Sequence, residues 1–110
     1  MKTFKDLKVT DVLYIICYDR YFYVCKVVRM SRLGIITRIY YDYADKYTEN
    51  NTVRYFDVNM EMCDEETSIE IALPGYVPFV IYLNRDDILK ELDERIENLK
   101  KQKRKIIKAL

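Results

Sequence analysis

Few residues in this chain could perform chemistry, and histidine is not among them. The 110 residues contain no His, no Trp, three Cys and two Gly. Without His there is no Ser-His-Asp or Cys-His catalytic arrangement, no imidazole general base and no imidazole metal ligand. Two glycines are too few for a dinucleotide-binding or Walker loop. We therefore expect a protein that is not an enzyme and that holds no cofactor and no metal.

The three cysteines, Cys17, Cys25 and Cys63, are the candidates for a reactive thiol or a metal ligand. They lack the C-x-x-C spacing of a zinc site, and three thiolates would need a carboxylate as a fourth ligand. A two-residue turn at Asp19-Arg20 would place Cys17 and Cys25 on opposite faces of a hairpin. We predict ordinary packed side chains in a reducing compartment, because three scattered cysteines are too few for a disulfide framework.

Carboxylates gather between Glu61 and Glu66 and invite a calcium hypothesis. The stretch lacks the D-x-D-x-D-G spacing and the glycine that wrap a loop around the ion. A paired-carboxylate glycosidase would need a deep cleft, which we do not expect in so small a protein. The sequence therefore predicts a solvated turn between two strands.

Eleven tyrosines are the most unusual feature of the composition. Tyrosine offers a binding partner a large rigid ring and one hydroxyl, and several of these tyrosines fall near strand ends and close to arginines. We predict a partner-binding surface made of Tyr18, Tyr21, Tyr23, Tyr40, Tyr41, Tyr43, Arg20 and Arg38. The expected partner is a protein. An alternative interpretation is that tyrosine simply fills strands with two bulky faces.

Nucleic acid is the other alternative partner, because bases stack on exposed aromatic rings while phosphates meet arginine. The basic tail at residues 100–105 could add to such a surface. Against this alternative, residues 40–84 carry two basic and nine acidic groups, which would repel phosphate.

Strands must position these side chains, because short runs rich in Val, Ile, Tyr and Phe recur about every ten residues up to Leu83. The predicted strands are Val12–Tyr18, Tyr21–Met30, Ile35–Tyr43, Thr52–Asn59, Thr67–Leu73 and Tyr76–Leu83. Six short antiparallel strands favour a small barrel or a strongly bent sheet, which leaves fewer open edges than a sandwich. We expect residues 1–84 to form a small antiparallel β-barrel of five or six strands.

After Leu83 the apolar residues recur every three or four positions, which predicts a helix over Arg85–Leu110 with Asn84 as its N-cap. The predicted seam is Leu89, Leu92, Ile96, Leu99, Lys103, Ile106 and Leu110. This spacing is typical of a coiled coil, so residues 85–110 are expected to be an amphipathic oligomerisation helix. Docking of the stripe on the chain's own barrel is the alternative, because Ile88 and Ile107 broaden it.

Charge is distributed unevenly along this helix, although the net charge of the chain is only +1. Residues 86–98 carry six acidic and two basic groups, and residues 99–110 carry six basic groups and no acidic one. Parallel helices would oppose like charges, whereas antiparallel helices would place Asp93 near the partner's Lys100. Each exposed pair contributes only about 0.3–0.5 kcal/mol, so charge selects the orientation and the apolar seam supplies affinity. We predict an antiparallel homodimer.

The sequence predicts a cytoplasmic location. The longest apolar runs, such as residues 12–18 and 77–83, are far shorter than the roughly 20 residues of a membrane-spanning helix. The first six residues are charged and lack the apolar core of a signal peptide. We therefore expect no membrane partner.

The segment Phe4-x-x-Leu7-Lys8-Val9-Thr10-Asp11-Val12-Leu13-Tyr14-Ile15 resembles the first strand of small SH3-like barrels. In those barrels a turn that ends in Gly-Asp precedes an apolar strand, and Thr10 stands here in place of the glycine. The resemblance implies a barrel that binds protein or nucleic acid through strand faces and loops. The composition, rich in Lys, Ile, Tyr and Asp, is similar to that of small phage and AT-rich bacterial proteins. It implies a phage accessory or virion protein, or an inhibitor of a host machine.

Overall fold

The computed structural model describes residues 1–17, 21–44, 51–72 and 78–110. Its elements in chain order are the 3₁₀ turn η1 (Phe4–Asp6), the strands β1 (Val12–Cys17), β2 (Tyr21–Leu33), β3 (Ile36–Ala44) and β4 (Asn51–Asn59), the short helix α1 (Met60–Cys63), the strands β5 (Ser68–Ile71) and β6 (Phe79–Tyr82), and the helix α2 (Arg85–Ala109).

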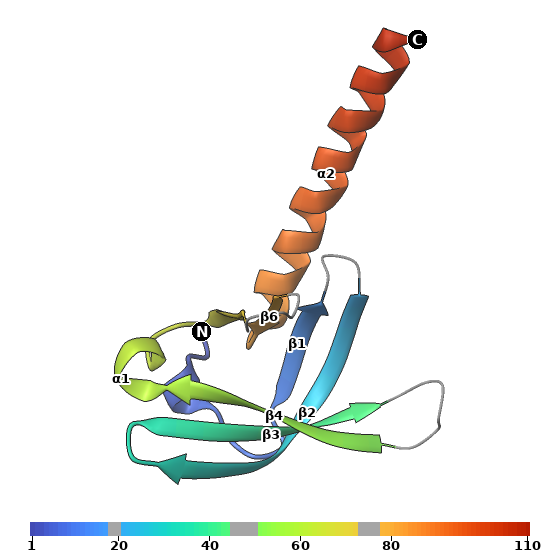
Figure 1. The fold of residues 1–110 in the computed structure, drawn as a ribbon. Coiled ribbons are helices and arrows are strands. Elements are labelled where there is room, and N and C mark those ends of the chain that lie inside the picture. The colour runs from blue at the N-terminus through green and yellow to red at the C-terminus, as the bar shows by residue number, and fades with distance from the viewer. Residues whose placement is uncertain (18–20, 45–50, 73–77) are drawn as a thin grey trace.

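The six strands form one antiparallel sheet in the order β4-β3-β2-β1-β6-β5. The sheet is strongly curled into a half-barrel, and α2 follows β6 and extends away from it (Figure 1). This confirms the predicted fold class, a mainly β body of barrel type followed by a long C-terminal helix. The two ends of the sheet order, β4 and β5, are the edges of the half-barrel.

The core lies on the concave side of the sheet, because alternate residues of each strand turn their side chains inward. In β1 these are Leu13 and Ile15, and in β3 they include Ile39. Phe4 and Leu7 pack against them, and the Phe4 backbone N–H donates to the Glu66 carbonyl at 3.0 Å. Each such fully buried apolar side chain stabilises the fold by roughly 1.5–3 kcal/mol.

A β-bulge in β2 changes which side chains face outward. The pairing of β2 with β3 shifts between Val27 and Arg29. After the shift Met30 lies opposite Ile39 and packs against the core, whereas Arg29 lies opposite Tyr40 on the convex side. Strict alternation along β2 would have placed Arg29 on the concave side, so the bulge decides where this guanidinium is presented.

The pairing of β1 with β2 corrects the expectation for the cysteines. Cys17 lies opposite Tyr21 and Leu13 lies opposite Cys25. Directly opposed residues share a face, and Leu13 and Cys17 share a face because they are four positions apart on one strand. Cys17 and Cys25 therefore lie on the same, concave side. The two-residue turn expected at Asp19-Arg20 would have paired Ile16 with Tyr23, but Ile16 pairs with Phe22. The turn itself lies outside the described residues.

Strand ends account for the other differences from the predicted ranges. β2 continues to Leu33, three residues beyond its predicted end. β5 spans only Ser68–Ile71 and β6 only Phe79–Tyr82. The predicted strand ends at residues 73 and 76–77 lie outside the described residues.

Asn84 occupies the N-cap position of α2, but its side chain does not cap the helix as predicted. Its Oδ1 accepts from the Lys2 backbone N–H at 3.0 Å, and its Nδ2 donates to the Lys2 carbonyl at 2.9 Å. A side-chain amide can donate and accept at the same time, so it pairs with both backbone groups of Lys2. This clasp ties the base of α2 to the beginning of the chain.

Within the described part of the chain, no helix combines the length and the apolar character needed to cross a membrane.

Candidate functional site

The predicted seam on α2 is largely exposed. Ile96, Leu99 and Ile106 are 50%, 64% and 63% exposed, and Leu110 is fully exposed. Single exposed apolar residues are ordinary on a protein surface, but a continuous stripe of them at heptad spacing is typical of a helix that pairs with another. Lys103 lies within the stripe and is also exposed. The stripe therefore offers a contact surface along the part of α2 that extends from the sheet (Figure 1).

Among the described residues, the part of α2 that packs on the chain's own sheet is its base. Ile88 is buried, Leu92 is half-buried and Leu89 is exposed. The Tyr82 ring lies beneath this base, where burial and then the Glu91 carboxylate raise its pKa. Because α2 leaves the sheet after these turns, the alternative in which the whole stripe docks on the chain's own barrel is not the arrangement in the structure.

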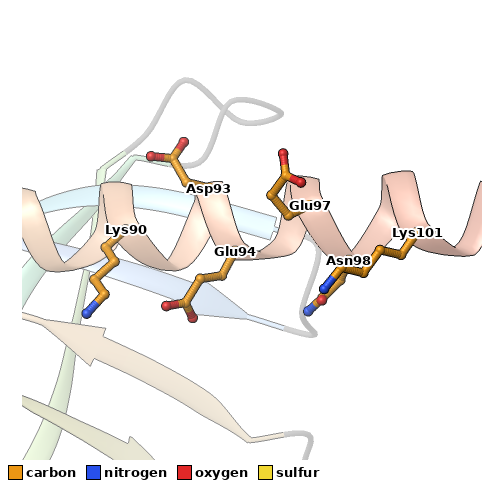
Figure 2. A pocket seen from close by; sticks show the side chains of 6 residues that line it. All are labelled: Lys90, Asp93, Glu94, Glu97, Asn98 and Lys101. Atoms are coloured by element: carbon orange, nitrogen blue, oxygen red, sulfur yellow. The ribbon is translucent and has the colours of Figure 1, made fainter.

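The opposite face of α2 is polar. Figure 2 shows six side chains that line an open hollow of about 530 Å³ on this helix, namely Lys90, Asp93, Glu94, Glu97, Asn98 and Lys101. Lys100 Nζ lies 3.4 Å from Glu97 Oε1, and Arg95 Nε lies 3.0 Å from Glu91 Oε1. Such surface pairs add little stability. The helix thus has one apolar and one charged face, which makes it amphipathic.

The predicted tyrosine surface is not assembled as one face. Alternation along β3 places Tyr40 on the convex side and Tyr41 on the concave side, where it is buried in the core. Tyr23 also packs against the core, and Tyr21 is exposed at the start of β2. Tyr41 is therefore a core residue in this structure rather than a surface one. Of the other predicted positions, Tyr18, Arg20 and the Tyr43 side chain lie outside the description.

Two arginine–tyrosine stacks stand on the convex face of β2, β3 and β4. The Arg29 guanidinium lies 4.1 Å from the centre of the Tyr40 ring, and the Arg38 guanidinium lies 4.2 Å from that of Tyr55. The two rings are 5.7 Å apart because Tyr40 and Tyr55 are directly opposed across β3 and β4. Tyr55, which is exposed, was not among the predicted residues. The sequence alone does not show that Tyr55 lies directly opposite Tyr40, and that pairing is what places it in this surface.

Arg38 also forms a bidentate pair with Asp57. Nε and Nη2 lie 2.8 and 3.1 Å from the two carboxylate oxygens. The hydrogen bond and charge of Arg38 lower the pKa of Asp57, and those of Asp57 raise the pKa of Arg38. The pair fixes the guanidinium over the Tyr55 ring and neutralises it, so this stack is a rigid, neutral platform rather than a free cation.

The three cysteines and the carboxylates of the acidic stretch have the following surroundings. Cys17, Cys25 and Cys63 are free thiols, and burial raises the pKa of Cys25 to about 11. At such a pKa the nucleophilic thiolate is scarce at neutral pH. Over residues 1–17, 21–44, 51–72 and 78–110, no group of three or more Cys, Asp or Glu side chains could hold a metal ion. In the acidic stretch, Glu65 forms an ion pair with Lys5.

A groove of about 620 Å³ opens between the two edges of the half-barrel. Its walls include Tyr41 and Phe56 on one side, and Ile71 and Phe79 on the other. Most of this lining is apolar, with Arg54 and Asp57 at its margin. Aromatic and aliphatic walls can accept an apolar side chain, but this set of groups contains no nucleophile paired with a base.

Comparisons with protein-family models, with curated proteins and with solved structures find no match to this chain.

Proposed function

We propose that this protein is a non-catalytic interaction and assembly module that self-associates through α2 as an antiparallel homodimer. The single observation that supports the proposal most is the exposed apolar stripe on the part of α2 that extends beyond the sheet. Burying a Leu or Ile side chain contributes roughly 1.5–3 kcal/mol, so covering the stripe on two helices offers a large driving force. The free energy of association is smaller than this sum, because docking costs translational and rotational freedom.

Charge supports a second copy as the partner. The acidic first half and the basic second half of α2 complement each other only when two helices run in opposite directions. The same arrangement sets the C-terminal end of one helix dipole beside the N-terminal end of the other. A helix of this chain is therefore a suitable partner for itself, and no second protein species is needed.

A charge placed in the seam tests this proposal. We expect Leu99→Asp to raise the dimer dissociation constant at least about 100-fold, because burying an unpaired carboxylate in place of leucine is strongly unfavourable. Asn98→Asp is the matched control, since it places the same carboxylate on the polar face, and it should leave the constant nearly unchanged. Sedimentation equilibrium measures both. Equal effects of the two substitutions would contradict the proposal.

Nucleic-acid binding is the second candidate, and the stacks of Arg29 on Tyr40 and of Arg38 on Tyr55 favour it. Stacked bases and backbone phosphates would use such a face together with the basic end of α2. The Asp57 carboxylate beside Arg38 weighs against it. Fluorescence anisotropy with a single-stranded oligonucleotide at about 50 mM salt tests this candidate, which predicts binding that weakens steeply as salt is added. An unchanged anisotropy would remove it.

The cellular context belongs to the same proposal. Three free thiols suit a reducing compartment, and we place the protein in the cytoplasm. A module without a reactive site acts by contact, as an accessory or virion protein of a phage or an inhibitor of a host machine would. Its further protein partner would meet the convex face that carries Tyr40 and Tyr55.

A further inference from the structure

Two rows of side chains on the convex face connect the base of α2 with an open surface. Directly opposed residues on neighbouring strands share a face. Each row crosses β6, β1 and β2 in that order. The first row is Tyr82, Tyr14 and Val24, and the second row is Val80, Ile16 and Phe22. All six side chains are aromatic or β-branched aliphatic groups, and two of them, Tyr14 and Tyr82, are tyrosines. The rows form a continuous apolar strip across three strands.

The strip is covered at one end and open at the other. α2 lies over Tyr82, and Ile16 in the middle of the strip is buried. At the β2 end Phe22 is 45% exposed and Val24 is 59% exposed. We call these two side chains the β2 shelf. The shelf continues the surface on which the base of α2 already packs.

Heptad geometry allows three antiparallel registers for two copies of α2. The seam has two kinds of position: Leu89, Ile96, Lys103 and Leu110 occupy the first, and Leu92, Leu99 and Ile106 the second. In an antiparallel pair, each layer of the seam joins a residue of the first kind on one helix to a residue of the second kind on the other. Ile96 then lies opposite the partner's Leu92, the partner's Leu99 or the partner's Ile106. From one register to the next, the partner helix shifts by seven residues. Each register therefore places different charged side chains beside the seam.

The flanking charges distinguish the three registers. With Ile96 opposite the partner's Leu92, Asp93 lies beside the partner's Asp93 and Arg95 beside the partner's Arg95. With Ile96 opposite the partner's Ile106, Lys100 lies beside the partner's Lys100. With Ile96 opposite the partner's Leu99, Asp93 lies beside the partner's Lys100 on both helices. The register with Leu92 also places Asp86 beside the partner's Lys100, but only the register with Leu99 opposes unlike charges without opposing like ones, so it is the favoured one.

This register carries the partner's last helical turn back to the base of α2. Leu89 lies opposite the partner's Ile106, and the partner's Leu110 lies near Arg85. The sheet lies on the side of α2 that carries Ile88, which is buried. In an antiparallel pair the partner's Ala109 lies on this same side of the seam.

We propose that the β2 shelf is the docking site for the last turn of α2 from the second copy, with the partner's Ala109 and the partner's Ile106 against Val24 and Phe22. This inference rests on the proposed antiparallel dimer. Alanine allows a close approach of the helix to the sheet, and Ile106 supplies an apolar side chain that is exposed in the isolated chain. The partner's basic helix end also passes Asp86 and Asp87 in the first turn of α2. Each sheet would thus hold both helices of the dimer.

Disulfide trapping between two differently substituted chains tests the contact. One chain carries Val24→Cys and the other Ala109→Cys, both in a background with Cys17→Ser and Cys63→Ser, and the two are mixed and oxidised. We expect mass spectrometry to find a disulfide that joins position 24 of one chain to position 109 of the other. Val53→Cys is the matched control, because Val53 is a similarly exposed valine on the convex face at the far edge strand β4. It should give at most a tenth of the product.

The outcomes separate this inference from the proposed function. Equal yields from positions 24 and 53, in a sample that sediments as a dimer, would overturn the shelf contact and leave the dimer in place. A sample that sediments as a monomer would overturn both. Ala109→Trp provides a second test that does not alter the sheet. It should raise the dimer dissociation constant at least tenfold, whereas Lys108→Trp, on the outer side of the same turn, should change it less than threefold. Equal effects of the two tryptophans would also overturn the contact.

Discussion

At the scale of single residues, Thr10 occupies a turn position whose backbone conformation favours glycine. Thr10 has φ +79°, a left-handed conformation that glycine adopts easily and β-branched residues rarely adopt. Its N–H donates to the Val27 carbonyl at 2.8 Å, and the Lys8 N–H donates to Asp11 Oδ2 at 2.8 Å. Threonine therefore bears backbone strain at this position.

Thr10→Gly should therefore stabilise the protein. Relief of the left-handed strain exceeds the entropy that glycine adds to the unfolded chain, and we expect a gain of about 1 kcal/mol in the free energy of unfolding. Urea denaturation measures it. Thr10→Ala, which keeps a Cβ, should stay near the wild type. A loss of stability in the glycine variant would show that the Thr10 side chain contributes more than its strain costs.

Cys25 should be the slowest of the three thiols to react. It is 4% exposed and its pKa is about 11, so roughly 0.1% of it is thiolate at pH 8 even where a reagent reaches it. Labelling of the native protein with iodoacetamide, followed by peptide mass spectrometry, should show Cys63 modified well before Cys25. In urea the two rates should converge. Rapid modification of Cys25 in the native state would contradict its place in the core.

At the scale of elements, the strands and the helix were predictable because their periods are clear. β1, β4 and α2 lie within one or two residues of the predicted ranges. The bulge after Val27 and the register of β1 with β2 were not predictable, because each depends on pairing across strands rather than on the order of residues along one strand. These two features decide the faces of Arg29 and Cys17, and the pairing of Tyr40 with Tyr55 likewise depends on register, so the arginine–tyrosine stacks could be predicted only in part.

The helix base depends on the clasp between Asn84 and Lys2. We expect Asn84→Ala to lower the free energy of unfolding by about 1–3 kcal/mol, because it removes two partly buried hydrogen bonds to the Lys2 backbone. Asn84→Asp keeps the acceptor for the Lys2 N–H and loses the donor, so its effect should be smaller. Thermal and urea unfolding compare the two. An alanine variant as stable as the wild type would mean that the clasp does not hold α2.

Lys103 is the polar residue in the seam, and its replacement should strengthen association. We expect Lys103→Leu to lower the dimer dissociation constant about tenfold, because a polar residue in a coiled-coil core is retained at a cost in stability. Lys101→Leu adds the same side chain on the polar face and serves as the control. Sedimentation equilibrium at several loading concentrations distinguishes them. If only Lys101→Leu strengthened association, the contact would lie on the polar face of α2, which would contradict the predicted seam.

At the scale of the whole molecule, a curled sheet bears a helix that extends well beyond it. The 25 residues of α2 span about 38 Å, and the chain measures 57 × 35 × 28 Å overall. An isolated helix of this kind exposes apolar surface that pairing would cover. The amphipathic pattern and the divided charge were both visible in the sequence. What the sequence could not show is that α2 leaves the sheet after its first turns, because this depends on where Ile88 and Asn84 attach it.

Sedimentation equilibrium of the unaltered chain tests self-association through α2 most directly. The chain has a mass of 13.3 kDa, and we predict that the weight-average mass rises with concentration and approaches twice this value. A mass that stays at 13.3 kDa at every concentration up to the millimolar range would contradict the account.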